Sequence, residues 1–172
     1  MRILPVAAFA LVAAPAQAAE IFGGITAHDV RTFLGKGGFE GGADLQLGWR
    51  GKRIGALKAI GAPSPYAFGS LSLAGDTNLA AAGLSWKLGG RLYLRPGLGL
   101  AIHDRSSHVV RGAFRADLGS RILFAPELGL GYRLTDRLSA EASWVHLSHA
   151  QLFSRQNPGL DNIGLRLNYR FR

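Results

Sequence analysis

Apolar and polar side chains alternate with a period of two along several short segments of the chain. From Asp44 to Arg50, the residues Leu45, Leu47 and Trp49 share one face and the other face is polar. Such a period is typical of a β-strand, whose successive side chains point to opposite faces. The same alternation recurs over residues 91–103, 121–133, 138–148 and 161–171. It predicts an all-β protein built from strands long enough to cross a bilayer.

Residues 20–27 and 64–74 alternate less clearly, because Gly and Ser interrupt the pattern. We predict strands there because a closed antiparallel sheet in lipid has an even number of strands and no open edge. With a further strand leading to Trp86, about eight strands are expected. The predicted fold class is an all-β, eight-stranded antiparallel up-and-down transmembrane β-barrel.

A soluble periplasmic β-sandwich or lipocalin-like barrel would show a similar alternation with its apolar face turned inward. Two features favour the membrane barrel. The polar face carries charges of both signs that can pair in a narrow lumen: Asp44, Lys87, Arg91, Arg95, Glu127, Glu141 and Arg166. The apolar face carries aromatic residues near the expected periplasmic strand ends, as in a membrane girdle: Trp49, Trp86, Tyr132 and Tyr169.

The predicted connections alternate in length. Short turns are expected at Lys52-Arg53, Gly89-Gly90 and Thr135-Asp136, whereas longer loops begin at His28 and His103. Short periplasmic turns and longer outer loops are usual in outer-membrane barrels. The segment 54–63 is an exception, since it makes one periplasmic connection longer than this pattern predicts.

The first residues have the features of a cleaved secretory signal peptide. Arg2 precedes a short apolar run, and Ala16-Gln17-Ala18 forms an Ala-x-Ala cleavage site. We therefore predict a signal peptide over 1–18, an outer-membrane β-barrel over 19–172, and a location in a Gram-negative outer membrane.

Composition narrows the chemistry and the partners. The chain contains no cysteine, which excludes disulfides and thiolate metal sites. Its net charge of +9 favours anionic partners, which in this membrane would be lipopolysaccharide phosphates. Nucleic acid is not expected, because the chain has no basic run, zinc-ligand spacing or aromatic RNA-binding motif.

The candidate chemistry lies near the end of the penultimate predicted strand. His146 and Ser148 are two residues apart and share the outward face of Trp144, so a nucleophile and its base would lie together. Asp161 begins the next strand at outward parity, where its carboxylate could orient the imidazole. The alternative is that Ser, His and Asp are simply common residues at strand ends near lipid headgroups.

The stretch from Ala142 to Ala150, followed by Asn157-Pro158-Gly159-Leu160-Asp161, resembles the lipid A 3-O-deacylase (PagL) family, also called acyloxyacyl hydrolases. The family pattern is His-x-Ser-Asn-Ala, then Asn-x-Gly-x and an acid. The resemblance implies an outer-membrane barrel that hydrolyses the ester-linked 3-hydroxyacyl chain at position 3 of lipid A without a cofactor. By position it makes His146 the base, Ser148 the nucleophile and Asp161 the acid.

Two positions depart from that pattern. His149 replaces an Asn that is a candidate oxyanion donor, and Asp161 stands where the family often has Glu. His149, Ala150 and Asn157 are the positions expected to contribute to oxyanion or substrate positioning. The alternative function is a non-catalytic barrel with a structural or lipopolysaccharide-binding role. A general pore is disfavoured because side chains fill a barrel of this size, and a homodimer remains an open alternative.

Other polar residues of the outer end carry weaker expectations. His28, His103 and His108 are read as scattered rim residues, and no metal site is expected, because His146 and His149 would lie on opposite strand faces. Four arginines of the predicted outer loops could meet lipopolysaccharide phosphates or be solvated: Arg105, Arg111, Arg115 and Arg155.

Overall fold

The computed structural model describes residues 18–35, 37–104, 117–153, 155 and 157–171. The predicted signal peptide therefore lies outside the described residues, except for Ala18. The strands are β1 (Ala18–Ala27), β2 (Ala43–Gly51), β3 (Ser64–Ser72), β4 (Leu79–Ser85), β5 (Leu88–Gly89), β6 (Leu92–His103), β7 (Ile122–Phe124), β8 (Glu127–Arg133), β9 (Leu138–Leu147) and β10 (Leu160–Arg170). A 3-10 helix, η1 (Gly55–Ile60), lies between β2 and β3.

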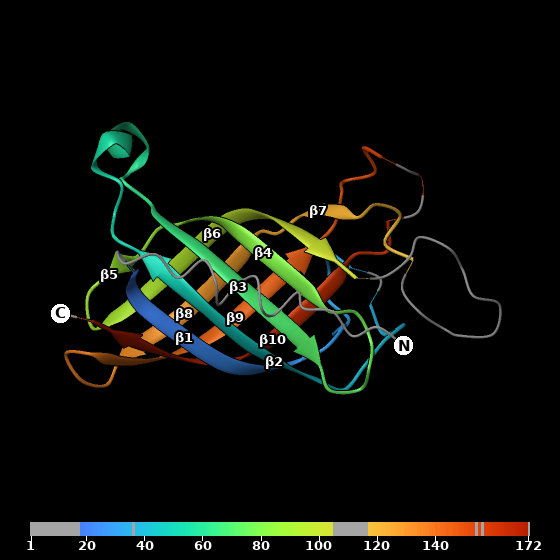
Figure 1. Cartoon of the computed structure of the whole chain (residues 1–172), viewed down its shortest axis with the longest axis horizontal. Coiled ribbons are helices and arrows are strands. Elements are labelled where there is room, and N and C mark those ends of the chain that lie inside the picture. The colour runs from blue at the N-terminus through green and yellow to red at the C-terminus, as the bar shows by residue number, and fades with distance from the viewer. Residues whose placement is uncertain (1–17, 36, 105–116, 154, 156, 172) are drawn as a thin grey trace.

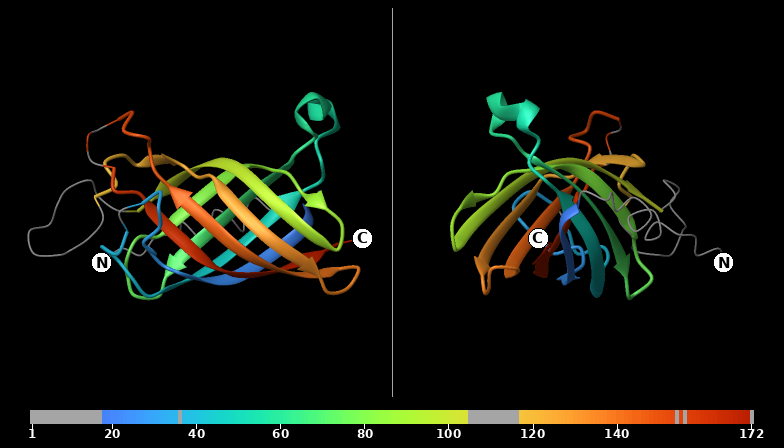
Figure 2. Two further views of the ribbon diagram at one scale, coloured as in Figure 1. Left: turned by 180° about the vertical axis from the view of Figure 1, so that it is seen from behind. Right: turned by 60° about the vertical axis from the view of Figure 1, so that its left-hand side comes forward.

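The sheet closes on itself as an antiparallel barrel (Figures 1 and 2). β1 pairs with β10, with Glu20 opposite Arg170 and Ala27 opposite Ile163. β4 and β5 both pair with β6, so they act together as one interrupted strand. β7 and β8 also both pair with β6 and form a second interrupted strand. Counted in this way the barrel has eight strands, which confirms the predicted fold class. The predicted strand 121–133 is interrupted at Ala125-Pro126, where the proline lacks the N–H that a ladder requires.

The outer wall of the barrel is apolar. Outward side chains on successive strands are exposed aliphatic residues, as a lipid-facing surface requires: Ile21, Ile25, Leu45, Leu47, Leu71, Leu92, Leu94, Leu98, Leu100, Ile102, Ile122, Leu128, Leu130, Ile163, Leu165 and Leu167. Ile21 lies between Trp49 and Tyr169, its cross-strand partners on either side. This row of residues fits the predicted aromatic girdle. No described helix has the length and apolar character needed to cross a membrane.

The lumen holds a network of paired charges. Arg50, Arg95 and Arg166 bind the carboxylates of Glu20, Glu127 and Glu141 at 2.9–3.8 Å, and all six side chains are almost fully buried. A buried charge without a partner would be costly, so these ions depend on one another. The expectation that the inward charges pair is confirmed for this group. It is wrong for Arg91, which precedes β6 and is exposed at the barrel mouth, with its guanidinium 5.1 Å from the Tyr132 ring.

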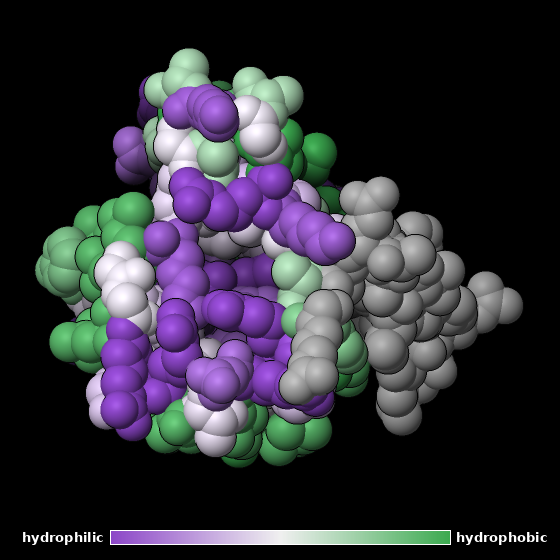
Figure 3. Space-filling model, turned by 90° about the vertical axis from the view of Figure 1, so that its left-hand side faces the viewer, coloured by the Kyte–Doolittle hydropathy of each residue, from purple (hydrophilic) through white to green (hydrophobic). Residues whose placement is uncertain are grey.

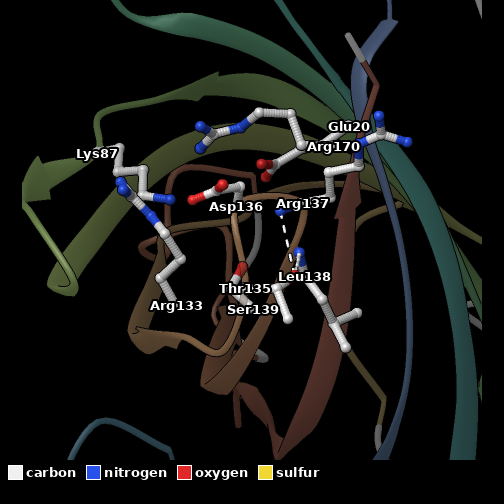
Figure 4. A pocket seen from close by; sticks show the side chains of 9 residues that line it. All are labelled: Glu20, Lys87, Arg133, Thr135, Asp136, Arg137, Leu138, Ser139 and Arg170. Carbon is white, nitrogen blue, oxygen red and sulfur yellow. Dashed lines mark hydrogen bonds between the residues drawn. The ribbon is translucent and has the colours of Figure 1, made fainter.

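The two ends of the barrel differ. The connections 86–91 and 134–137 lie at the end that holds both ends of the described chain, which we take as periplasmic because short turns mark that side. Figure 3 faces this end, where polar side chains surround a hollow between hydrophobic flanks. Figure 4 shows its lining, which combines acidic and basic side chains: Glu20, Lys87, Arg133, Thr135, Asp136, Arg137, Leu138, Ser139 and Arg170. The outer end carries the described parts of the longer connections, which are residues 28–35, 37–42, 104, 117–121, 148–153, 155 and 157–159.

Candidate active site

The outer ends of β9 and β10 bring His146 and Asp161 together. The two residues are direct cross-strand partners in the antiparallel register, so their side chains project from the same face. The Nδ1 atom of His146 lies 3.0 Å from Oδ1 of Asp161. The carboxylate is fully buried and the imidazole is nearly so. The expected juxtaposition of these residues therefore follows from strand register.

Asp161 also receives hydrogen bonds from two residues that the sequence did not indicate as site residues. The indole Nε1 of Trp144 donates to Oδ1 at 2.6 Å, and the Thr32 hydroxyl donates to Oδ2 at 2.9 Å. The backbone N–H of Val30 donates to the Asp161 carbonyl at 2.8 Å. With His146, three side chains therefore fix the carboxylate, one of them from the loop between β1 and β2.

Two glycines let the backbone approach this pair. A Cβ atom on Gly35 would lie 2.4 Å from Oδ2 of Asp161, and one on Gly159 would lie 3.0 Å from Cε1 of His146. Gly159 also has φ +74°, in the left-handed region that favours glycine. The loop is held from outside as well, since the rings of Phe33 and Trp144 lie 5.7 Å apart. The first outer loop therefore forms part of the site.

Ser148 follows directly after β9 and is half-buried. The Phe124 N–H donates to the Ser148 carbonyl at 2.7 Å, and the Ser148 N–H donates to the Phe124 carbonyl at 3.2 Å. Two residues beyond His146, Ser148 retains the outward parity of the strand. Within the described residues its hydroxyl makes no hydrogen bond to His146. Because Nδ1 of His146 faces Asp161, Nε2 is the imidazole nitrogen that the carboxylate does not engage.

His149, Ala150 and Asn157 shape the loop that follows Ser148. The His149 ring is fully buried and lies 5.8 Å from the Phe153 ring. The His149 N–H donates to the side-chain oxygen of Asn157 at 3.2 Å. Ala150 and Gln151 have φ of 51° and 59°, and the Leu152 N–H bonds to the His149 carbonyl, which closes a tight turn. These residues set the path of the chain immediately beyond the candidate nucleophile.

The other histidines have partners of their own. His28 lies at the outer end, as expected, but it is buried between Glu40 and Asp44 at 2.9 Å from each rather than exposed on the rim. His103 is also buried, and its Nε2 lies 2.7 Å from the Ser120 carbonyl oxygen. Among the described residues no group of His, Asp or Glu side chains is arranged to hold a metal ion. His108, Arg105, Arg111 and Arg115 lie outside the described residues, and Arg155 is exposed.

Charges set the ionisation of the His28 cluster. Burial alone would lower the pKa of His28, but hydrogen bonds to Asp44 and Glu40 and their negative charges raise it to about 9. Burial would raise the pKa of Glu40, but bonds from His28 and Thr77 lower it to about 2. His28 is therefore a buried imidazolium ion at neutral pH, outside the His146–Asp161 pair.

The residues that support Asp161 were not predictable from the sequence to the same degree. Trp144 shares the outward face with His146 two positions away, so strand parity could have indicated it. Thr32 and Gly35 lie in a loop far away in sequence, and no local pattern links them to Asp161. Their role depends on barrel closure, which places β1 beside β10.

Comparison with known proteins places the barrel in a family. The family model described as "Lipid A 3-O-deacylase (PagL)" matches residues 38–170. No curated protein sequence matches the chain. Among solved structures, the crystal structure of the outer membrane enzyme PagL is similar at 19% identity and a TM-score of 0.61, covering 89% of this chain and 100% of that one. Neisserial surface protein A is similar at 12% identity and a TM-score of 0.53, covering 88% of this chain and 96% of that one. The match over most of the barrel shows that this chain belongs to the lipid A 3-O-deacylase (PagL) family.

Proposed function

We propose that this outer-membrane barrel hydrolyses the ester-linked 3-hydroxyacyl chain at position 3 of lipid A. Family membership supports the broader activity of an outer-membrane lipid A deacylase. The finer assignment makes Ser148 the nucleophile, His146 the general base and Asp161 the orienting acid. The observation that carries it is the 3.0 Å contact between His146 and Asp161 on the outward face, two residues before Ser148.

The proposed chemistry is acyl transfer through a serine ester. Asp161 accepts a hydrogen bond from Nδ1–H of His146, which leaves a lone pair on Nε2. Ser148 Oγ attacks the ester carbonyl carbon while Nε2 takes its proton. Collapse of the tetrahedral intermediate breaks the bond to the sugar oxygen, and the imidazolium returns the proton to that oxygen. Water then releases the 3-hydroxy fatty acid by the same steps, and neither a metal nor a cofactor is needed.

The loop after Ser148 supplies the positions proposed for the oxyanion and the substrate. A negative oxygen forms in the intermediate, and fixed donors beside it lower the barrier. His149, Ala150 and Asn157 are the candidates. Because Asn157 holds the backbone of His149, a change at either residue would move the loop beside Ser148.

The surroundings suit a lipid substrate that stays in the membrane. The outward wall beside the site is apolar, with Ile163 and Leu128 exposed, and Phe33 is 87% exposed next to Trp144. An acyl chain could therefore reach Ser148 without leaving the hydrocarbon region. Exposed Arg155 lies in the loop after β9, where it could meet a lipid A phosphate. The proposal includes export by the signal peptide over 1–18.

The test measures 3-hydroxy fatty acid released from lipopolysaccharide by the purified, refolded barrel, using mass spectrometry. Wild-type protein is expected to release it, and Ser148→Ala is expected to release none above background. Ser143→Ala is the matched control, because Ser143 lies on the same strand and its buried hydroxyl has no hydrogen-bond partner among the described residues. Equal release by wild type and Ser148→Ala would remove Ser148 from the mechanism. A lipid A profile identical with and without the wild-type barrel would instead indicate a non-catalytic barrel.

A further inference from the structure

The connection between β2 and β3 forms a compact lobe at the periplasmic end. Residues 52–63, called here the periplasmic lobe, contain η1 and make a longer connection than the other turns at this end. The lobe projects sideways from the barrel wall instead of continuing along the barrel axis (Figures 1 and 2). The proposed active site lies at the opposite end, so deacylation does not explain this feature.

The lobe is fixed to the barrel. One short 3-10 segment has little stability alone, so its shape depends on neighbouring contacts. The Arg53 guanidinium donates to the carbonyls of Gly61 and Ala62 at 2.8 and 2.9 Å, which closes the base. The Trp86 indole, just after β4, donates to the Ile60 carbonyl at 2.6 Å. Gly61 has φ +88°, and a Cβ atom there would lie 3.2 Å from the Trp86 ring. The lobe therefore keeps a defined position beside the wall.

The surface of the lobe combines apolar and cationic side chains. Ile60 is 54% exposed, and Ile54 and Leu57 are half-exposed. Lys52 and Lys58 are exposed, and the sequence of residues 52–63 contains no Asp or Glu. In Figure 3 the upper part of the molecule shows hydrophilic and hydrophobic residues side by side. Apolar residues beside cations, without acids, are typical of segments that lie in a membrane interface.

The direction of the lobe points to the same environment. The barrel axis crosses the bilayer, so a segment that projects sideways from one end of the barrel extends toward the surrounding membrane surface. Trp86, which follows β4, ties the lobe to the barrel, so the lobe lies beside the barrel wall at the periplasmic end. Anionic phospholipid headgroups at the membrane surface attract lysines.

We propose that the periplasmic lobe is an interfacial anchor that lies on the periplasmic leaflet of the outer membrane. Ile60 enters the boundary with the acyl chains, and Lys52 and Lys58 lie beside phosphate groups of anionic phospholipids. The anchor would fix the depth and tilt of the barrel independently of the chemistry at the outer end.

The absence of native cysteine allows a clean test with one nitroxide label. Ile60→Cys carries the label on the lobe, and Gly90→Cys is the control in another turn of the same end, where a Cβ atom meets nothing within 4 Å. Both proteins are reconstituted into vesicles of phosphatidylcholine and phosphatidylglycerol. The two leaflets of these vesicles have the same composition, so the direction in which the barrel inserts does not affect the result. Relaxation by oxygen, which enters lipid, is compared with relaxation by a water-soluble nickel chelate.

The oxygen-to-nickel ratio is expected to be several-fold higher at residue 60 than at residue 90. Adding Lys52→Glu and Lys58→Glu to the labelled lobe is expected to lower the ratio at residue 60. Equal ratios at residues 60 and 90 in a folded barrel would overturn the proposal. Dipolar broadening between labels at residue 60 in dilute vesicles would also overturn it, because a second copy of the chain would then cover the lobe.

Discussion

The contact between Gly35 and Asp161 gives a prediction that perturbs the site without removing any functional group. In Gly35→Ala, the new Cβ atom would lie 2.4 Å from Oδ2, whereas ordinary van der Waals contact begins at 3.4 Å. The carboxylate or the loop must therefore move by about 1 Å. A misplacement of this size costs about a hundredfold in rate, or about 2.7 kcal/mol of transition-state stabilisation.

The assay compares kcat/KM for fatty acid release from lipopolysaccharide by Gly35→Ala and Gly41→Ala. Gly41 lies in the same loop, and a Cβ atom there meets nothing within 4 Å, so this control should keep wild-type activity. Heat-dependent electrophoretic mobility would establish that both barrels are folded. If folded Gly35→Ala were as active as Gly41→Ala, the reasoning that ties the placement of Asp161 to catalysis would be refuted.

Three further predictions concern donors, lumen charges and pH. Thr32→Val removes one hydrogen bond to Asp161 and should lower kcat about tenfold with little change in KM; an unchanged kcat would exclude a positioning role for this hydroxyl. Glu141→Gln removes a carboxylate that pairs with Arg50, Arg95 and Arg166, and it should lower the free energy of unfolding by about 3–5 kcal/mol. Urea titration in lipid vesicles measures this change, and an unchanged urea midpoint would contradict it. The pKa of His28 is raised, so the stability that its charge contributes to the fold is complete below its ordinary pKa of 6.5 and is lost as pH rises through about 9. The pKa of Glu40 is lowered, so the stability that its charge contributes is lost as pH falls through about 2. The urea midpoint of wild type should therefore fall more between pH 6 and pH 10 than that of His28→Gln, and equal falls would show that His28 is not responsible.

The strands were predictable because lipid enforces strict alternation on most of them. The weak pattern over 64–74 still corresponded to β3, since closure requires a strand there. β4 could not be delimited from pattern, because its sequence, LAAAGLS, is mostly small residues that suit either face. The break at Pro126 follows from the missing N–H and could have been anticipated from the sequence.

The candidate site was predictable only where local parity decides it. His146 and Asp161 share outward parity at the ends of adjacent strands, so their approach followed from the predicted pairing. The placement of Thr32 depends on how the first outer loop folds over β10, and that of His28 on Glu40 and Asp44 meeting in the lumen mouth. Those contacts join distant segments, and no periodicity in one sequence encodes them.

The most direct test of the central claim is to identify the serine that an ester-like phosphonate modifies. The refolded barrel would be treated with a lipophilic fluorophosphonate, and the adduct located by peptide mass spectrometry. We expect loss of activity together with one adduct on Ser148, and much slower labelling in His146→Ala. An active barrel that the reagent inactivates through another serine, leaving Ser148 unmodified, would contradict this expectation.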